Sequence, residues 1–258
     1  MSAVVKSSPR VKDIVSPEEW RARQELACAY RLFDHFGWHE LIYNHITVRV
    51  PGEDRHFLIN PFGLMYREVT ASNLVAIDVE GSPVRPTPYP VNRAGFVIHS
   101  AIHRAREDAH AVAHTHTTAG QAVSCQEHGL LPMSFSAVVF HGRIAYHDYE
   151  GITLDLEEQE RLLAHLGDKN VMILRNHGLL TCGPTLADAF HEMYQLQRSC
   201  EVQVAALAGG TKVIIPREEL AVRATGQFSS SARHGAENRM MFDAVTRWMM
   251  DKDPSFLE

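Results

Sequence analysis

Three histidines carry the chemistry that the sequence signals most strongly. His114 and His116 are separated by one residue at the end of a predicted strand, AHAVAH at 109–114. Side chains two residues apart on a strand project to one face, about 6 to 7 Å apart, which is close enough to share one metal ion. His177 follows the apolar run at 171–174 and offers a third imidazole. Three histidines with an open fourth position are typical of a catalytic metal site.

The same pattern also has ordinary explanations. With 16 histidines in 258 residues, a His-x-His pair can arise by coincidence. His99 and His103 stand four residues apart on a predicted helix and resemble half of an HExxH zinc motif, but Ser100 occupies the place of its glutamate. We therefore expect this pair to pack or to support the site. Gly178, directly after His177, would let the backbone approach a ligand.

Composition excludes several classes of protein. The 25 lysines and arginines against 31 aspartates and glutamates give a net charge of -6, which offers no global attraction for nucleic-acid phosphates. The apolar runs stop far short of the roughly 18 to 20 residues that cross a bilayer. The four cysteines lie far apart without a CxxC pair, and residues 1–13 lack a signal-peptide core. We expect reduced thiols and a cytoplasmic protein with neither nucleic acid nor membrane as partner.

The elements that must position the histidines alternate between helix and strand. Ser16 and Pro17 begin a helix that Gly37 ends. Residues 1–15 are expected to form a flexible arm and residues 16–258 a single domain. A hairpin is predicted at 45–50 and 56–60, further strands at 74–79, 109–114 and 171–174, and helices at 92–106, 187–208 and 238–250. This order favours an α/β sandwich, a sheet covered by helices on both faces.

Four stretches taken together resemble the class II aldolase/adducin family over roughly residues 18–230. They are NRAGFVIHSAIH at 92–103, AVAHTHTTAGQAVS at 111–124, AYHDYEG at 145–151 and ILRNHGLLT at 173–181. FLINPFG at 57–63 adds similarity to the adducin-like branch. The resemblance implies a three-layer α/β/α sandwich with a central, mainly antiparallel sheet. It also implies a cyclic homotetramer with active sites near subunit boundaries.

The family's metal site corresponds to three residues of this sequence. The resemblance implies one divalent metal ion per chain, held by His114, His116 and His177. Zinc is the expected ion, and manganese, cobalt and iron are the alternatives.

The sequence departs from the sugar-phosphate aldolases of that family at the catalytic and phosphate-binding positions. Gly95 stands where those enzymes have a glutamate that binds the metal and acts as the base. Their phosphate-binding stretches, rich in glycine, asparagine and serine, correspond here to residues 44–49 and to Arg93-Ala94. Bulkier groups in these places disfavour a phosphate nest of backbone amides. Ordinary aldolase activity is therefore not expected, and a non-phosphorylated substrate fits better.

Three residues in the altered stretches are candidates for binding that substrate. The planar guanidinium of Arg93 could bind a carboxylate through two parallel hydrogen bonds, although a surface or intersubunit salt bridge explains it equally well. Asn44 and Thr47 are the other two candidates.

These observations favour a metal-dependent lyase for a small non-phosphorylated hydroxy- or oxo-carboxylic acid. The reaction would be decarboxylation or retro-aldol cleavage through a metal-stabilised enolate. Departing carbon dioxide generates the carbanion without a base, but a proton donor must then quench it. Tyr146, Tyr149 and His45 are the candidate catalytic residues, with His147 as a further donor. For the two tyrosines the alternative is a hydrogen-bonded packing role.

Two other functions use the same residues. Three histidines can also hold iron(II), which would make the protein a non-haem oxygenase on the same fold. An adducin-like binding protein could keep the histidines without catalysis, because fold and motif do not by themselves establish an activity.

Overall fold

The structure, a computed structural model, describes residues 10–53, 55–151, 156–229 and 234–258. For residues 93–96, 156, 229 and 234 only the backbone is described. Within these ranges seven strands form one sheet in the order β3-β2-β1-β4-β7-β6-β5. The strands are β1 His45–Arg49, β2 His56–Ile59, β3 Val75–Asp78, β4 Ala111–Thr115, β5 Ile144–His147, β6 Val171–Leu174 and β7 Gly178–Gly183. Neighbours run antiparallel except β5 and β6, which are parallel.

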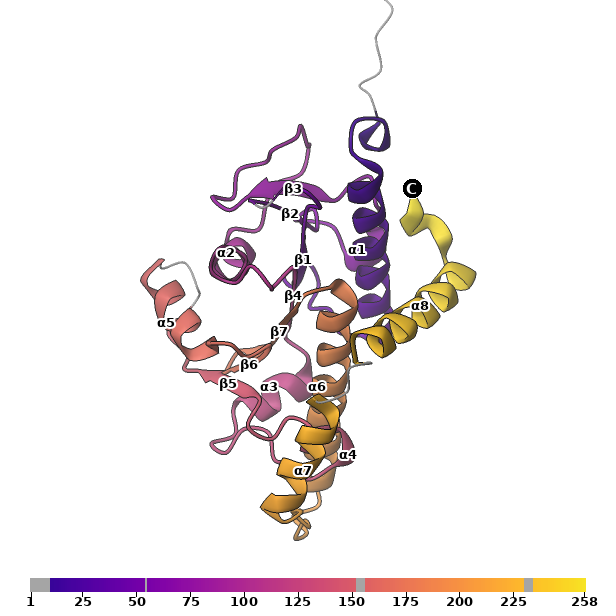
Figure 1. Cartoon of the computed structure of the whole chain (residues 1–258). Helices are drawn as coiled ribbons and strands as arrows, with labels where there is room; N and C mark the ends of the chain where they lie inside the picture. Colours follow the sequence, from indigo (N-terminus) through magenta and orange to yellow (C-terminus); the bar gives the residue numbers. More distant parts are fainter. Residues whose placement is uncertain (1–9, 54, 152–155, 230–233) are drawn as a thin grey trace, which may run out of the picture.

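Helices cover both faces of this sheet (Figure 1). α2 and α5 lie on one face, and α1, α6 and α8 lie on the other. The predicted three-layer α/β/α sandwich with a mainly antiparallel sheet is therefore confirmed. The helices are α1 Pro17–Phe36, α2 Arg93–Ala105, α3 Thr118–Ser124, α4 Phe135–Val138, α5 Leu156–Leu166, α6 Leu186–Leu207, α7 Glu218–Ser229 and α8 His234–Lys252. Short 3-10 helices occupy Val11–Asp13, Tyr66–Glu68 and Pro254–Leu257.

Local sequence signals account for the first elements. Ser16 accepts a hydrogen bond from the Glu19 amide at 3.0 Å, and Pro17 occupies the first helical position of α1. Gly37 ends that helix with φ 70°, a left-handed conformation that favours glycine. The predicted hairpin is confirmed by the pairing of β1 with β2.

The alternation of side chains along the central strands divides the core into two parts. On β7, Leu179 packs into the cluster beneath α1 and α6, whereas Leu180 packs into the cluster beneath α2 and α5. On β4, Val112 belongs to the cluster on the α2 side, so His114, two residues on, projects to that same face. The fold thus presents His114 between the sheet and α2.

Glycine is needed at position 178 for a reason other than the expected approach of the backbone to a ligand. Gly178 begins β7 opposite Leu174, and a Cβ built at this position would collide with the backbone oxygen of Thr115 on β4. Glycine is therefore required for the close approach of two strands rather than for a ligand. Because His177 precedes this glycine and His116 follows Thr115, the same close approach brings two of the three histidines together.

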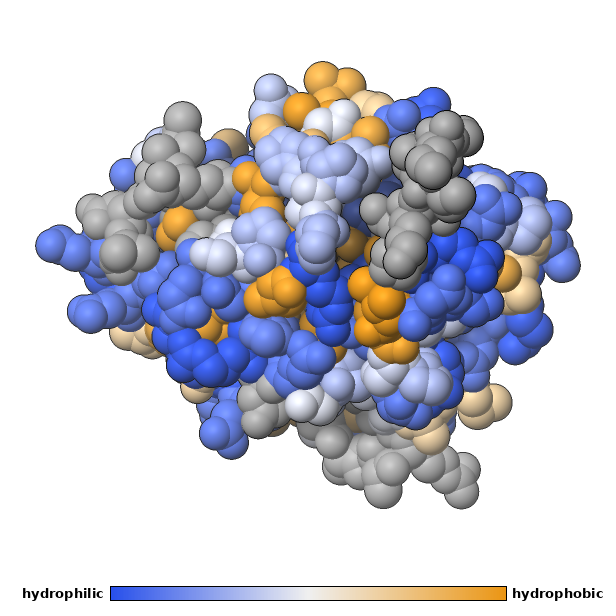
Figure 2. Space-filling view, turned by 90° about the horizontal axis from the view of Figure 1, so that it is seen from above, coloured by the Kyte–Doolittle hydropathy of each residue, from blue (hydrophilic) through white to orange (hydrophobic). Residues whose placement is uncertain are grey.

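Figure 2 shows a mainly hydrophilic face, on which apolar residues form small separate groups. None of the helices in the described part of the chain has the length and apolar composition to span a bilayer.

Replacing Gly178 with alanine should destabilise the protein. The added methyl group must displace backbone of β4, and overpacking of this kind costs about 1 to 3 kcal/mol. Urea denaturation of Gly178→Ala measures this loss in the free energy of unfolding. Gly209→Ala is the matched control, because no atom lies within 4 Å of its added Cβ, and its change should stay within about 0.5 kcal/mol. Equal stability of the two variants would contradict the role given to Gly178.

Candidate metal centre

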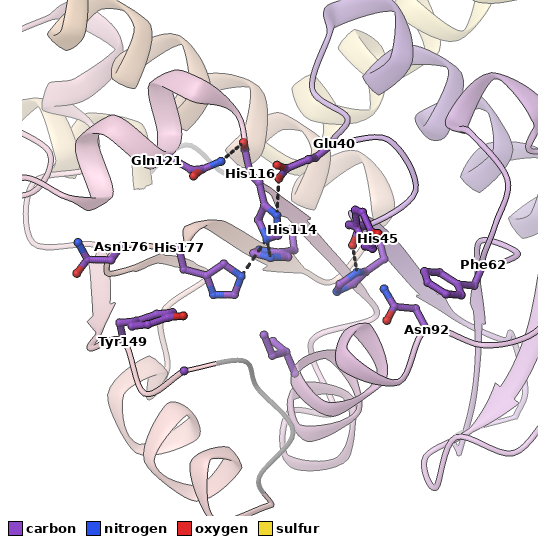
Figure 3. Close-up of a pocket in the computed structure, with 13 residues that line it drawn as sticks. Glu40, His45, Phe62, Asn92, His114, His116, Gln121, Tyr149, Asn176 and His177 are labelled. Atoms are coloured by element: carbon purple, nitrogen blue, oxygen red, sulfur yellow. Dashed lines mark hydrogen bonds and ion pairs between the residues drawn. The ribbon is translucent and has the colours of Figure 1, made fainter.

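The structure brings the three predicted histidines together (Figure 3). His114 lies on β4, His116 lies between β4 and α3, and His177 lies in the turn between β6 and β7. The Nε2 atom of His116 is 2.7 Å from that of His114 and 2.9 Å from that of His177. Ligand atoms of all three side chains lie within 4.8 Å of one another.

Hydrogen bonds on the outer side of two rings fix their tautomers. The Nδ1 atom of His114 donates to the carbonyl oxygen of Leu179 at 2.8 Å, and Nδ1 of His116 donates to the Glu40 carboxylate at 2.8 Å. A neutral imidazole with a proton on Nδ1 carries a lone pair on Nε2. The two Nε2 lone pairs therefore point into the centre of the cluster, as metal ligands require.

Burial keeps the three imidazoles neutral. It lowers the pKa of His177 to about 4 and lowers the pKa values of His114 and His116 below their ordinary range. Metal ions bind imidazole only in its neutral form. Closely spaced lone pairs repel unless a proton or a cation lies between them. The donor set therefore fits a divalent ion that accepts nitrogen ligands, with zinc as the first choice.

Two residues that the sequence analysis did not select hold His116 in place. Glu40 reaches it from the segment that follows α1, and Gln121 on α3 donates to the backbone oxygen of His116 at 2.6 Å. Thr117 caps α3 by accepting from the Gly120 amide at 3.1 Å. A threonine before a helical segment is a recognisable cap signal, so helix spacing could have placed Gln121 near His116. Glu40 carries no comparable local signal.

The cluster opens into a pocket of about 560 Å³. Tyr43, Phe62 and Tyr149 contribute aromatic side chains to its lining, and Asn92 contributes an amide. A pocket of this size and mixed lining is typical of a binding site for a small molecule.

The predicted catalytic residue His45 lies in this pocket. It is paired with His114 across β1 and β4, and their ring centroids are 5.4 Å apart. Its Nδ1 atom donates to the Tyr43 carbonyl at 3.3 Å. Burial lowers the pKa of His45 to about 3, so the ring is neutral at pH 7. A neutral imidazole is better suited to accept a proton than to act as the general acid.

The two predicted catalytic tyrosines lie in different places. Tyr149 lines the pocket and is 56% exposed. Tyr146 instead accepts a hydrogen bond from the Leu130 amide at 3.1 Å, and the Arg175 guanidinium lies 4.4 Å from its ring centroid. It lines a separate cavity of about 190 Å³. The structure therefore does not bring Tyr146 to the three histidines.

His147 belongs to a different group of side chains. It is buried, and its Nδ1 atom lies 2.9 Å from Nδ1 of His165 on α5. It is not among the described residues that line the pocket.

The substrate-binding candidates are not gathered at the pocket. Asn44 is buried and is not among the described lining residues. Thr47 is fully buried, with its hydroxyl between His99 and His103. The side chain of Arg93 lies outside the described part of the structure. Asn92, the residue before the candidate Arg93, lines the pocket.

Comparisons with known proteins agree with the resemblance found in the sequence. The chain matches the family model "Class II Aldolase and Adducin N-terminal domain" over residues 24–204. It is 52% identical to rat alpha-adducin over 189 residues, which are 72% of this chain and 26% of that protein.

Two solved structures extend this similarity to the fold. An aldolase II superfamily protein from Pseudomonas syringae is 47% identical, with a TM-score of 0.91 and coverage of 97% of this chain and 100% of the other. L-fuculose 1-phosphate aldolase from Glaciozyma antarctica is 28% identical, with a TM-score of 0.80 and coverage of 95% and 96%.

Purified protein should contain about one divalent ion per chain. Removing two of three nitrogen ligands should abolish binding, so elemental analysis of the double variant His114→Ala, His116→Ala should find essentially none. The matched control is His110→Ala, His128→Ala, which removes two exposed histidines and should retain the ion. Stoichiometric metal in the first variant would contradict the site.

The Glu40 carboxylate should strengthen metal binding through His116. Loss of such an outer partner typically weakens affinity 10- to 100-fold, so Glu40→Ala should raise the zinc Kd by about that factor. Glu40→Gln keeps a hydrogen-bond acceptor without the charge and should fall between wild type and alanine. Competition with a chromophoric chelator measures the three values, with Glu127→Gln as the surface control. An unchanged Kd in Glu40→Ala would show that the contact has no such role.

Proposed function

The chain belongs to the class II aldolase and adducin family, and on that basis we propose that it is a divalent-metal-dependent lyase. Its substrate in this proposal is a small, non-phosphorylated hydroxy- or oxo-carboxylic acid, cleaved by decarboxylation or retro-aldol reaction. The observation that carries the proposal is the convergence of three neutral imidazoles on one point of an open pocket. The name of the Glaciozyma antarctica relative adds support for carbon–carbon lyase chemistry.

His114, His116 and His177 would hold the ion. When bound, a divalent ion supplies Lewis-acid polarisation of a substrate oxygen. His114 and His116 have the tautomer that this binding needs, all three side chains are neutral, and zinc matches a site of three nitrogen donors.

His45 and Tyr149 are the residues of this chain proposed to handle protons. His45 is neutral beside His114, so in a retro-aldol reaction it would accept the proton of a substrate hydroxyl. Tyr149 lines the same pocket and would donate its phenolic proton to the carbon left by carbon dioxide. Tyr146 has no part in this proposal, because it lines a different cavity.

The charge in the pocket favours a non-phosphorylated substrate. Glu40 contributes a carboxylate to the lining, and its negative charge would oppose a doubly charged phosphate. Tyr43 and Phe62 line the pocket as well, and their ring centroids are 6.4 Å apart. They would cover the apolar part of a small acid. Carboxylate binding by Arg93 and assembly into a tetramer remain predictions from the sequence.

A non-catalytic binding function is the second candidate. It is supported by the 52% identity to rat alpha-adducin, although the chain corresponds to 26% of that protein's length. In this case the pocket would bind a small acid without converting it.

One experiment separates these functions. Protein loaded with zinc, manganese or iron(II) is offered a panel of 2-oxo, 2-hydroxy and 2-hydroxybenzoic acids, with and without oxygen. A lyase releases carbon dioxide or a carbonyl fragment without oxygen. The rate should fall at least about 100-fold in His114→Ala, His116→Ala and persist in His110→Ala, His128→Ala.

Other outcomes would redirect the proposal. Oxygen consumption with iron(II) identifies an oxygenase, and saturable binding without any product identifies a binding protein. Rapid cleavage of a ketose phosphate by the unmodified chain would contradict the proposed substrate class.

A further inference from the structure

A buried row of polar side chains lies behind the metal pocket, between β1 and α2. The Thr47 hydroxyl is 2.7 Å from Nδ1 of His99 and 2.8 Å from Nε2 of His103. The other ring nitrogen of His103, Nδ1, is 3.0 Å from the carbonyl oxygen of Ala109. Each of the three side chains is at least 98% buried, so water does not compete for these contacts.

The row has one direction of hydrogen bonding, and it is set by the carbonyl at its end. The Ala109 oxygen can only accept, so His103 donates from Nδ1 and carries a lone pair on Nε2. Thr47 must then donate its hydroxyl proton to His103 and accept from Nδ1 of His99. Burial lowers the pKa of both rings, that of His103 to about 3, which keeps each ring to a single N–H. His99 is thereby left with an unprotonated Nε2.

The His99 ring contacts the ring of His45, which lines the pocket. Their ring centroids are 4.4 Å apart with an interplanar angle of 63°, and His45 in turn lies beside His114. The Nε2 atoms of His45 and His99 are both buried and have no hydrogen-bond partner among the described residues. Because Nδ1 of His45 donates to the Tyr43 carbonyl, its Nε2 is also an acceptor.

We propose that Thr47 is a positioning residue of the metal pocket: its hydroxyl fixes the rotation and the tautomer of His99, which holds the His45 ring beside His114. His45, the member of this group that lines the pocket, then carries an acceptor at Nε2. A ligand group that reaches this nitrogen must donate a hydrogen bond, as a hydroxyl does and a carboxylate oxygen cannot. Thr47 itself does not touch the ligand, because both sides of its hydroxyl are occupied within the core.

The row orients groups and does not carry protons to the pocket. A proton passed from His99 through Thr47 to His103 would have to leave at the Ala109 carbonyl, which has no proton to exchange. The role of Thr47 is therefore independent of the reaction that the pocket performs.

Nuclear magnetic resonance of protein with ¹⁵N-labelled histidine tests this role, because long-range proton–nitrogen correlations report the tautomer of each ring. Wild-type protein, with and without zinc, should show His99 and His103 as Nδ1–H tautomers. Thr47→Val has nearly the same shape without the hydroxyl, so His99 should become a mixture of tautomers and the His45 signals should shift. Thr47→Ser restores the hydroxyl and should restore the wild-type pattern.

A matched control separates this effect from general loss of a buried hydroxyl. Thr181 on β7 is also fully buried and donates to the Ala189 carbonyl, so Thr181→Val should leave the His99 and His45 signals in place. His114, anchored by the Leu179 carbonyl, should keep its tautomer in every variant.

The proposal is overturned by wild-type His99 in the Nε2–H form, or by a folded Thr47→Val protein with unchanged His99 and His45 signals. If Thr47→Val does not fold, the tautomer of His99 in the wild-type protein still tests the proposal, because the Nε2–H form would overturn it. These measurements need no substrate. The proposal for Thr47 can therefore fail or hold independently of the result of the lyase assay.

Discussion

The mutual approach of the Nε2 atoms of three neutral imidazoles is the constraint on which the rest of the site depends. Where two lone pairs meet, as at the 2.7 Å between His114 and His116, they repel, so the rings must be held from their outer side. The backbone carbonyl of Leu179 and the carboxylate of Glu40 do this for two of them. The close approach of β4 and β7 at Gly178 sets the position of the third ring, that of His177. The central strands therefore fix the geometry of the histidines as well as forming the core.

Local patterns in the sequence were sufficient for several elements and for the three histidines. The Ser16 cap, the Gly37 end of α1 and the His-x-His pair each depend on neighbours in sequence, and the structure contains them as predicted. Strands β5 and β7 were missed, because short apolar segments show little periodicity of their own. Glu40 was missed because its importance arises from a contact with a residue 76 positions away.

Tyr146 and Thr47 show why a residue's type and motif do not determine its role. Both lie in stretches that resemble functional stretches of the family, yet strand alternation directs one side chain to a separate cavity and the other into the core. Which face of a strand points inward depends on how the strand pairs and on the helices that cover it. Neither can be predicted from the residues of the strand alone. The family thus fixes the sheet and the histidine cluster, and the residues around them must be placed by structure.

The distribution of the anchoring residues along the chain has a thermodynamic consequence. His116 and His177 are 61 positions apart in sequence, so an ion held between them would act as a crosslink that exists only in the native state. Ligands that bind only the folded form add about 2.7 kcal/mol at 100 times their Kd. For the proposed metal-bound form, chelation would therefore lower the melting temperature as well as empty the pocket.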